Sequence, residues 1–450
     1  MHKKKGLLIL LSVLVCHLAM AQNDERYKEY SKEDDIAPGL SNNILKLKKS
    51  YKLGDGITLR SSAGSFNVSQ SLQTSFLVNT ANKDLTNMSS TFNLTRARLS
   101  ISSNLFDSKW SIYGRLNLPA NYQSVTSGNR SFNTVLQEAY VEYRPSITHS
   151  FSAGLRADYI DSRETRIEGE SLGFINRSIV SSSFDAIFDY GFRYKGIYRL
   201  GGKNLLKSYL SVTTGDSRAS LQKNYGGFKY GVRLDYLPFD KFSKGGEFYM
   251  DDLAREEKPK LVIGVVYSYN NGASSALGTN GGRYIYGDSL QNELLPNYSK
   301  MGSDFLFKYN GWYAMGSYFI TKATVPDNIA GEFRLNGSFN TGPYTTMTSD
   351  KIKDTVRTRL NLGNGINMQG GYLFPCNWAV SGRYSVLTED NISNNFADYN
   401  KSYSVVFTKY LSGHNLKIQT EIGFDEFKNA LKTATQKGNY YSQLMVTVQL

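Results

Sequence analysis

The chain has 450 residues, and it combines 32 Tyr, 24 Phe and 40 Gly with only 9 Pro at a mean hydropathy of -0.39. This composition suits a large sheet whose two faces differ. Beyond the first residues there is no run of about 20 apolar residues, which excludes a membrane-spanning helix. The formal net charge of +13 leaves nucleic acid, an anionic surface or anionic solutes as partners.

The first 21 residues have the layout of a secretory signal peptide. Lysines occupy positions 3–5, an apolar run covers 7–18, and a small-x-small cleavage site follows at 19–21. An N-terminal membrane anchor is the weaker alternative, because a helix needs about 20 apolar residues to cross a bilayer. We therefore expect export and cleavage after Ala21. Export makes nucleic acid the least suitable partner, so we expect none, and it leaves Cys376 without an internal disulfide.

Residues 22–52 are highly charged and predict a short exposed lead-in with little core potential. Beyond them, apolar residues take every second position over segments of about ten residues. The segments are 65–79, 110–118, 151–159, 186–195, 228–236, 261–269, 378–386 and 416–424. This alternation predicts strands with one face toward an apolar phase and the other toward water or polar groups.

Segment length and connection length distinguish a membrane barrel from a soluble sandwich, whose strands alternate in the same way. Many segments have about nine to eleven residues, the span of a tilted membrane-crossing strand, whereas soluble strands centre on about five or six. Short turns such as 106–109 and 411–415 alternate with long polar loops such as 160–185 and 270–302. This pattern is typical of outer-membrane barrels.

We predict an all-β fold, a transmembrane antiparallel β-barrel over residues 53–450. A signal peptide at 1–21 and a charged periplasmic lead-in at 22–52 are expected to precede it. About seventeen strand candidates are present, and the alternation of short and long connections slips between residues 320 and 365. Because bacterial single-chain barrels have even strand numbers, we expect sixteen strands, with eighteen as the alternative.

The final stretch, residues 440–450, again has apolar residues at alternate positions. It predicts the strand that closes the barrel against the first one, with Leu444, Val446, Val448 and Leu450 toward lipid. Tyr440 or Tyr441 is expected in the interfacial aromatic girdle.

The polar faces of the predicted strands would line the lumen, and they carry more basic than acidic side chains. The basic members are Arg96, Arg98, Arg115, Arg156, Arg193, Lys195, Lys229, Arg233, Arg383 and Lys417. The acidic members are Asp158, Asp189, Asp235 and Glu421. Low-dielectric walls focus such a field and favour anions, and arginine has a planar fork suited to phosphate or carboxylate. The alternative is structural, since pairs such as Arg156 with Asp158 or Arg233 with Asp235 would lock the wall.

The connection 160–185 is one of the longest, and it would narrow a wide barrel if it folds inward. Its basic members Arg163, Arg166 and Arg177 are candidates for a constriction. Four acidic residues oppose them, namely Asp161, Glu164, Glu168 and Glu170. We therefore expect a constriction without strong selection by charge sign.

No constellation in the sequence predicts catalysis or metal binding. His149 and His414 fall in predicted tight turns, and the spacing places no Ser–His pair of a hydrolase. No His/Cys cluster has metal-ligand spacing, and Asp251 and Asp252 are expected in a solvated polar loop. We therefore expect no enzyme activity, no cofactor and no metal.

Several segments resemble the phosphate-selective porin O and P family, and they follow the family's order. They are LGDGITLRSSAGSF (53–66), TRARLSIS (95–102), LQEAYVEYRP (136–145), GFINRSIVSSSF (173–184), DYGFRYKG (189–196), LFKYNGWYAMGSYF (306–319), GINMQGGYLFPCNWAVSGRYS (365–385) and YLSGHNLKIQ (410–419). The resemblance covers the chain from about residue 53 onward. It implies a sixteen-stranded outer-membrane barrel, usually a trimer, that passes small anions through a basic constriction.

The sequence therefore predicts a porin of the outer membrane of a Gram-negative bacterium, for passive diffusion of small hydrophilic solutes. A preference for anions, and for phosphate among them, is the finer hypothesis. The expected partners are small anions, outer-membrane lipid and the other copies of a homotrimer. Two alternatives are open: a non-conducting barrel that serves a surface secretion or adhesion complex, and a soluble exported all-β binding protein.

Overall fold

The structure is a computed structural model, and it describes residues 46–47, 52–106, 108–118, 135–216, 224–275, 284–334, 337–390, 398–428 and 435–450. These residues belong to one compact unit, Lys46–Leu450. The expected signal peptide and most of the expected lead-in lie outside the described residues. None of the described helices has the length and apolar character that a membrane crossing needs.

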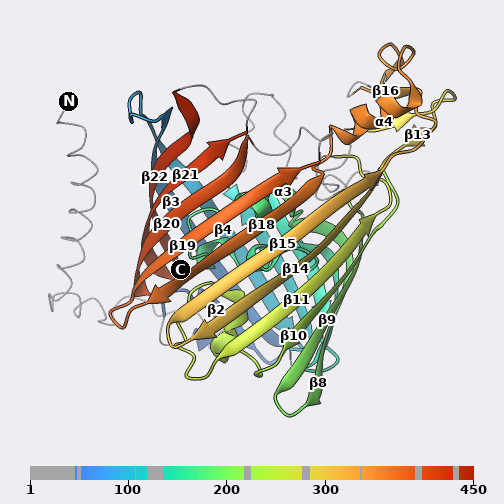
Figure 1. The fold of residues 1–450 in the computed structure, drawn as a ribbon. Helices are drawn as coiled ribbons and strands as arrows, with labels where there is room; N and C mark the ends of the chain where they lie inside the picture. The colour runs from blue at the N-terminus through green and yellow to red at the C-terminus, as the bar shows by residue number, and fades with distance from the viewer. Residues whose placement is uncertain are drawn as a thin grey trace, which may run out of the picture. The chain divides into compact units, whose positions relative to one another are not determined.

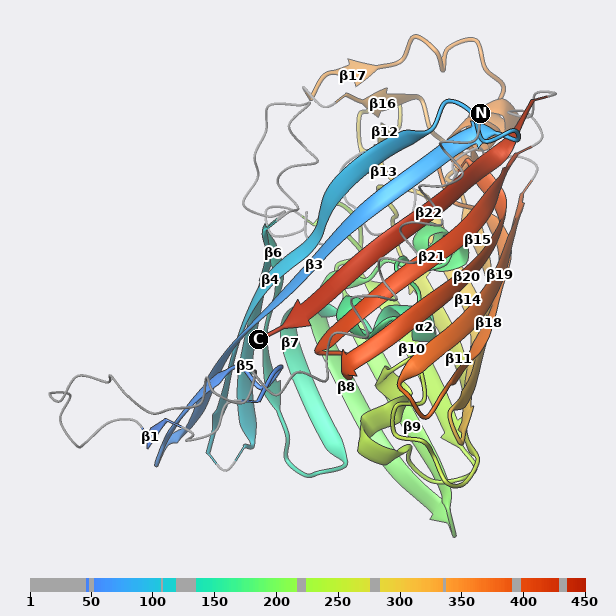
Figure 2. The same cartoon turned by 90° about the vertical axis from the view of Figure 1, so that its left-hand side faces the viewer.

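The described strands form a closed antiparallel barrel (Figures 1 and 2). Its members in chain order are β3 (Gly64–Asn82), β4 (Ser89–Leu105), β5 (Trp110–Asn117), β6 (Leu136–Tyr143), β7 (His149–Ala157), β8 (Phe188–Gly201), β9 (Asn204–Thr213), β10 (Lys229–Leu237), β11 (Lys260–Asn270), β14 (Asn297–Tyr309), β15 (Trp312–Thr324), β18 (Gly363–Leu373), β19 (Trp378–Glu389), β20 (Tyr399–Ser412), β21 (Leu416–Phe427) and β22 (Gln436–Gln449). Each pairs with the next, and β22 pairs with β3, so sixteen strands close the ring. The predicted barrel and its strand number are confirmed.

Two short strands extend the sheet at the start of β3. β2 (Ile57–Ser61) pairs with the first residues of β3, and β1 (Lys46–Leu47) pairs with β2. The last residue, Leu450, exchanges backbone hydrogen bonds with Gln70, at N···O distances of 2.7 and 3.2 Å. The end of β22 therefore joins β3 just beyond the part of β3 that β2 covers.

The predicted closing strand is confirmed, because β22 runs beside β3 in the register Leu444↔Phe76, Val446↔Thr74 and Val448↔Leu72. Its inner face carries Met445, which is fully buried. The two tyrosines take opposite faces. Tyr440 packs its ring against Phe424, with centroids 4.5 Å apart, whereas the Tyr441 hydroxyl donates a hydrogen bond to Glu421.

The barrel has two unlike ends. Short connections such as 202–203, 310–311 and 413–415 join strands at one end, which we call the turn end. The other end, which we call the loop end, holds the long connections. One connection breaks this alternation: residues 238–259, between β10 and β11, lie at the turn end but form a long segment with a 3-10 helix, η8 (Ser243–Phe248).

The slip in alternation between 320 and 365 arises from a small module at the loop end. Strands β12 (Ile285–Gly287), β13 (Glu293–Leu294), β16 (Gly331–Phe333) and β17 (Phe339–Asn340) form a separate four-stranded sheet beside helix α4 (Ser349–Arg357). The helix packs Ile352 and Val356 against Tyr286, Ile329 and Tyr344. Strand candidates in this region therefore belong to a separate sheet and not to the barrel.

The two faces of the barrel differ as the alternation predicts. Large apolar side chains are exposed on the outer face, among them Phe92, Phe192, Val265, Met301 and Phe407. The intervening residues point inward and are mostly polar. An apolar outer belt around a polar interior matches a strand surface in contact with lipid, and the closed ring excludes the sandwich alternative.

Candidate functional site: the barrel lumen

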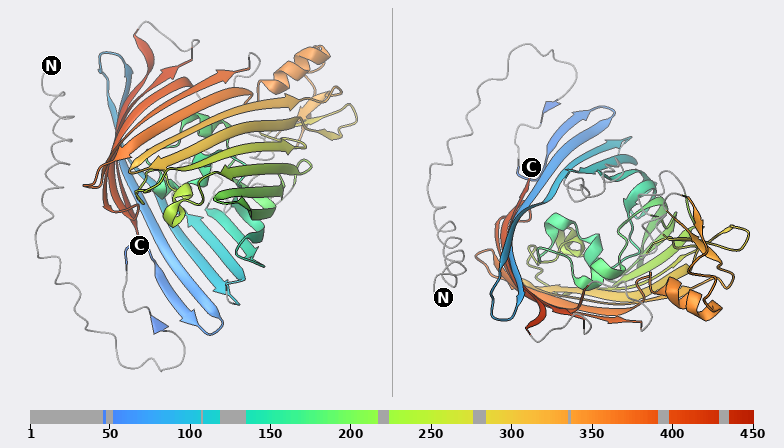
Figure 3. Two further views of the ribbon diagram at one scale, coloured as in Figure 1. Left: turned by 60° about the horizontal axis from the view of Figure 1, so that its bottom comes forward. Right: turned by 90° about the horizontal axis from the view of Figure 1, so that it is seen from above.

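The connection between β7 and β8 lies inside the barrel. It contains α2 (Arg163–Arg166), the 3-10 helix η6 (Gly169–Ser171) and α3 (Ile179–Phe184). Seen from above, these helices lie within the ring of strands (Figure 3, right). We call residues 158–187 the loop-side insert. It contains the segment 160–185 that the sequence marks as a candidate constriction loop, and its effect on pore width stays a prediction.

Serine caps fix the local structure of the loop-side insert. The side chain of Ser162 accepts from the Thr165 amide at the start of α2, and Ser178 accepts from the Ser181 amide at the start of α3. Such caps satisfy amide groups that a short helix leaves without partners. The two caps are also linked, because the Ser162 and Ser181 hydroxyls lie 2.9 Å apart. The insert therefore has a defined conformation of its own.

A buried cluster of five charged residues attaches the loop-side insert to β10 and β14. Arg163 donates to Asp304 at 3.1 Å and to Asp235 at 2.9 Å. Arg166 donates to Asp235 at 2.6 Å, and Arg233 donates to Asp304 at 2.6 and 2.8 Å. The two aspartates and Arg163 and Arg233 are at most 3% exposed. Because removing one member of such a cluster leaves a buried charge uncompensated, these side chains are structural anchors.

Two further groups of contacts hold the loop-side insert. Lys300 on β14 forms ion pairs with Asp161 and Asp185. On β19, three strands further along the sheet, Arg383 contacts Glu421 at 3.0 Å and Glu164 at 3.7 Å. The insert therefore has anchors on both β14 and β19.

A second segment enters the barrel from the turn end. We call residues 238–259, between β10 and β11, the turn-side insert. Lys207 forms an ion pair with Glu247, and Lys308 donates to the carbonyls of Gly246 at 2.8 Å and Asp251 at 2.9 Å. The Met250 sulfur accepts from the Gly173 amide at 3.2 Å, so the two inserts touch.

The expectation that Asp251 and Asp252 lie in a solvated loop is wrong. They are 1% and 0% exposed. Asp251 accepts from the Tyr410 hydroxyl, and Asp252 accepts from the Gly311 amide at 2.8 Å. Both carboxylates serve to attach the turn-side insert to barrel residues, because their partners lie on β20 and in the β14–β15 turn.

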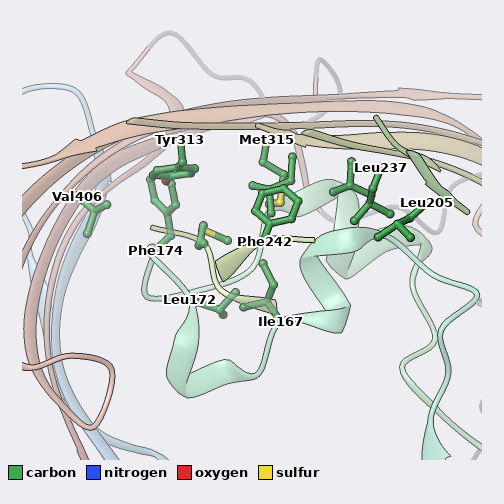
Figure 4. Packing of buried hydrophobic residues seen from close by; sticks show 12 residues of the cluster. Ile167, Leu172, Phe174, Leu205, Leu237, Phe242, Tyr313, Met315 and Val406 are labelled. Carbon is green, nitrogen blue, oxygen red and sulfur yellow. The ribbon is translucent and has the colours of Figure 1, made fainter. Parts of the chain in front are cut away.

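An apolar cluster joins both inserts to the wall (Figure 4). Ile167, Leu172 and Phe174 come from the loop-side insert, and Phe242 and Met250 from the turn-side insert. The wall supplies the other members, Leu205, Leu237, Val262, Leu306, Tyr313, Met315 and Val406. Each fully buried side chain of this size contributes roughly 1.5–3 kcal/mol. The cluster is therefore a core inside the barrel, and it occupies space between the inserts and strands β9 to β20.

The ten wall cations expected from the sequence all lie on inner faces, but their exposure differs. Six are buried: Arg98, Arg193, Lys229, Arg233, Arg383 and Lys417. Four are partly exposed: Arg96, Arg115, Arg156 and Lys195. Their role as anion-attracting residues stays a prediction, and the partly exposed four are the ones that a solute can reach.

One of the two proposed wall pairs is correct. Arg233 contacts Asp235 at 2.9 Å. The pair of Arg156 with Asp158 is wrong: Arg156 lies 3.6 Å from Glu142, whereas Asp158 lies 3.6 Å from Arg193. Residues of like parity on one strand share a face, but cross-strand neighbours are often closer.

The wall also carries inward-facing charged residues of both signs that were not predicted. The basic ones include Lys207, Lys300 and Lys308. Glu138, Glu142 and Asp304 face inward and form ion pairs with arginines. The inserts add further acids, including Glu164 and Glu247. The inward position of the wall acids could have been predicted from the alternation along 297–309 and 136–143. In each segment the acid stands an even number of positions from other polar residues, and such residues share a face of the strand.

A small polar cavity of about 180 Å³ lies between the loop-side insert and strands β3 to β5. Glu170 accepts from Ser71 at 2.6 Å and from Arg98 at 2.8 Å. Arg115 donates to Glu168 at 2.6 Å, and Glu168 is exposed. Burial alone would raise the pKa of Glu170, but the charge of Arg98 and the hydrogen bond from Ser71 outweigh it and lower the pKa to about 2. Glu170 is therefore ionised at neutral pH.

Five lumen cations named so far form no ion pair within the described part of the chain. They are Arg96, Arg177, Lys195, Lys308 and Lys417. Arg177, Lys308 and Lys417 donate to backbone carbonyls instead, and Arg177 lies 2.7 Å from the Ile167 carbonyl oxygen. Burial lowers the pKa of Arg177. The other named cations of the walls, together with Arg163 and Arg166 of the loop-side insert, form ion pairs with carboxylates.

No group of His, Cys, Asp and Glu in the described residues has the arrangement of a metal site. Cys376 is exposed as a free thiol. The side-chain clusters of the lumen are therefore ion pairs and hydrogen-bond networks.

No family model matches the chain, and no curated protein matches it. Solved outer-membrane porins do match it in structure. An anion-selective porin from Comamonas acidovorans is 8% identical with a TM-score of 0.50, covering 86% of this chain and 100% of that one. Salmonella typhi OmpF, in a complex with daunomycin, is 11% identical with a TM-score of 0.50, covering 87% and 100%. At this identity the similarity shows the porin-type barrel fold, while the resemblance to the phosphate-selective family stays an expectation.

Proposed function

We propose that the protein is an outer-membrane channel of a Gram-negative bacterium for passive diffusion of small hydrophilic solutes, with a weak preference for anions. The observation that carries this proposal is a closed sixteen-stranded barrel with an apolar outer belt and a charged lumen that holds an inserted loop. The anion-selective porin from Comamonas acidovorans has the same type of barrel. The proposed orientation places the turn end in the periplasm and the loop end outside the cell.

The solute path runs between the loop-side insert and the wall formed by β3 to β8. This wall carries the partly exposed cations Arg96, Arg115, Arg156 and Lys195. Carboxylates compensate the charges of Arg115 and Arg156. The field that attracts anions therefore comes mainly from Arg96 and Lys195. Because a low-dielectric wall focuses such a field, we propose modest anion selectivity, with phosphate among the permeant solutes.

Assembly as a homotrimer belongs to the same proposal. Only the resemblance to trimeric porins supports it, and the measurement that checks it is the mass of the detergent-solubilised complex. A monomer in mild detergent would remove the trimer from the proposal without affecting the channel.

The test is a single-channel recording in a planar bilayer, followed by the reversal potential under a KCl gradient and then with phosphate as the anion. We expect discrete conductance steps and a reversal potential of the sign that chloride permeation gives. Cation selectivity would refute the anion preference. Absence of conductance would refute the channel.

A second function is favoured by one specific observation, the contact between the two inserts inside the barrel. A lumen filled from both ends suits a non-conducting barrel that acts as a scaffold or partner at the cell surface. The two proposals are distinguished by a variant in which a short Gly-Ser turn replaces residues 239–258. If the native protein is silent and this variant conducts, the turn-side insert is a plug and the scaffold proposal is supported.

A further inference from the structure

A pocket of about 420 Å³ lies at the turn end, between the turn-side insert and the β20–β21 turn. Tyr249, Leu253 and neighbouring residues of the insert form one side, and residues 412–415 form the other. Its volume lies in the range of small-molecule sites, which is about 300–1,000 Å³. The pocket adjoins the small polar cavity around Glu168 and Glu170, because Tyr249 lines both.

His414 is the unusual residue of this pocket. It is 7% exposed, and neither ring nitrogen has a hydrogen-bond partner among the described residues. Its ring stacks on Tyr249, with centroids 5.1 Å apart, and meets the edge of Tyr410 at 5.3 Å. Because buried polar groups nearly always have partners, a ring held in place by two aromatic neighbours with both nitrogens free indicates a ligand.

The surrounding charges indicate the sign of that ligand. Lys52 and Lys244 are exposed at the rim, and Lys308 is buried in the wall. Lys308 uses two donors on the carbonyls of Gly246 and Asp251, which leaves its third N–H free.

Burial and the nearby charges of Lys417 and Lys308 lower the pKa of His414 well below its usual value. The imidazole is therefore neutral, with one nitrogen as donor and the other as acceptor. The Asp251 side chain is the acidic member of the pocket, and one of its oxygens accepts from Tyr410. Three ammonium groups and an imidazole N–H against one carboxylate favour an anion over a cation.

We propose that this pocket binds a small anion with carboxylate or phosphate oxygens, which accept hydrogen bonds from the His414 ring and from the ammonium groups of Lys308, Lys244 and Lys52. In the proposed orientation the pocket opens toward the periplasm. It would hold an anion beside the turn-side insert, since Tyr249 and Lys244 belong to that insert and Lys308 anchors it. The site does not depend on conduction, so its test stands whether or not the barrel is an open channel.

The test uses the full barrel in nanodiscs with isotope-labelled histidine and follows the ring resonances by NMR. Inorganic phosphate is titrated in one arm and succinate in the other, at constant ionic strength with chloride as the compensating ion. His149 is the internal control, because its Nδ1 already lies 2.8 Å from the Tyr194 hydroxyl. We expect a saturable shift of the His414 signal with at least one anion and no shift of the His149 signal. A response to one anion alone identifies the oxygen source, and a response to both indicates a general anion site.

Two variants separate binding from structure. His414→Phe keeps the aromatic stacking and removes both ring nitrogens, and Lys244→Gln alters an exposed side chain without touching the core. We expect calorimetry to show at least a tenfold weaker affinity for the first and a several-fold weaker affinity for the second. The proposal is overturned if neither anion shifts His414 saturably, which means that water alone satisfies the ring, or if His414→Phe binds the anion as the native protein does.

Discussion

Replacing Asp304 with asparagine tests whether the charged cluster between the loop-side insert and the wall has the role that its geometry indicates. Asp304 accepts from the Arg163 amide at 3.0 Å, from Arg163 Nε at 3.1 Å, and from Arg233 at 2.6 and 2.8 Å. Asparagine has the same shape but no charge. The cluster of three arginines and two aspartates would retain a single carboxylate, that of Asp235.

The expected loss follows from burial. Asp304 and Arg233 are 3% and 0% exposed as residues, so water cannot compensate the missing charge. Removing one partner of a buried pair costs about 3–5 kcal/mol, and we expect Asp304→Asn to lower the free energy of unfolding by that amount. Because Arg163 starts α2, the loss falls first on the loop-side insert.

Urea unfolding of the refolded barrel, with limited trypsin digestion at Arg163 and Arg166, measures both effects. We expect a lower unfolding midpoint and faster cleavage within 158–187. The matched control is Asp327→Asn, because Asp327 forms an exposed ion pair with Lys353 and surface pairs contribute little. Equal midpoints for Asp304→Asn and the native protein would refute the role assigned to the buried cluster.

Four further predictions follow from the lumen and the closing strand. The ionised Glu170 contributes roughly 3 kcal/mol to the free energy of unfolding above its usual pKa of 4.5, and this contribution is lost as the pH falls toward about 2. In Glu170→Gln the urea midpoint of unfolding should therefore depend less on pH over that range. The same pH dependence in the variant and the native protein would count against the contact. Lys195→Glu should move the reversal potential toward cation selectivity, while Lys351→Glu on α4 should not. Met250→Ala should lower the free energy of unfolding by about 2–5 kcal/mol. Because it loosens the contact between the two inserts, it should also raise the single-channel conductance in bilayer recordings. Deleting residues 444–450 should abolish assembly, and a truncated protein that still inserts and resists heat in detergent would contradict closure by β22.

Alternation along the sequence was sufficient to predict which residues share a face. The inward set, from Arg96 to Lys417, follows from a period of two, and the pairing of β22 with β3 follows from closure of the sheet. The partner of each inward side chain could not be predicted in this way. Arg163 and Asp304 are 141 positions apart, and only closure of the barrel brings α2 beside β14. Alternation along a strand therefore predicts which side chains face the lumen, but it does not predict which charged side chains form ion pairs with each other.

The turn-side insert was not predicted for a different reason. Its sequence is charged and rich in turn residues, and Asp251 and Asp252 fit a solvated loop. Its burial depends on partners that other strands supply, such as Lys308 for the carbonyls and Tyr410 for Asp251. An apolar group, Phe242, Phe248 and Met250, was the available signal within the segment. Polar residues can be buried when the enclosing wall offers complementary groups, and a barrel lumen is such a wall.

Packing inside the barrel links the width of the path to the stability of the fold. The two inserts inside the lumen contribute Phe174 and Met250 to the apolar cluster, so neither insert can move away without exposing buried side chains to water. Moving an insert to widen the path would therefore lower the free energy of unfolding. A loop held to the wall by exposed contacts alone could move at a smaller cost. For the proposed channel, this coupling gives a physical reason for a narrow, fixed path. Solutes would pass along the β3–β8 side, where the wall cations are partly exposed, while the side with the apolar cluster remains a packed core.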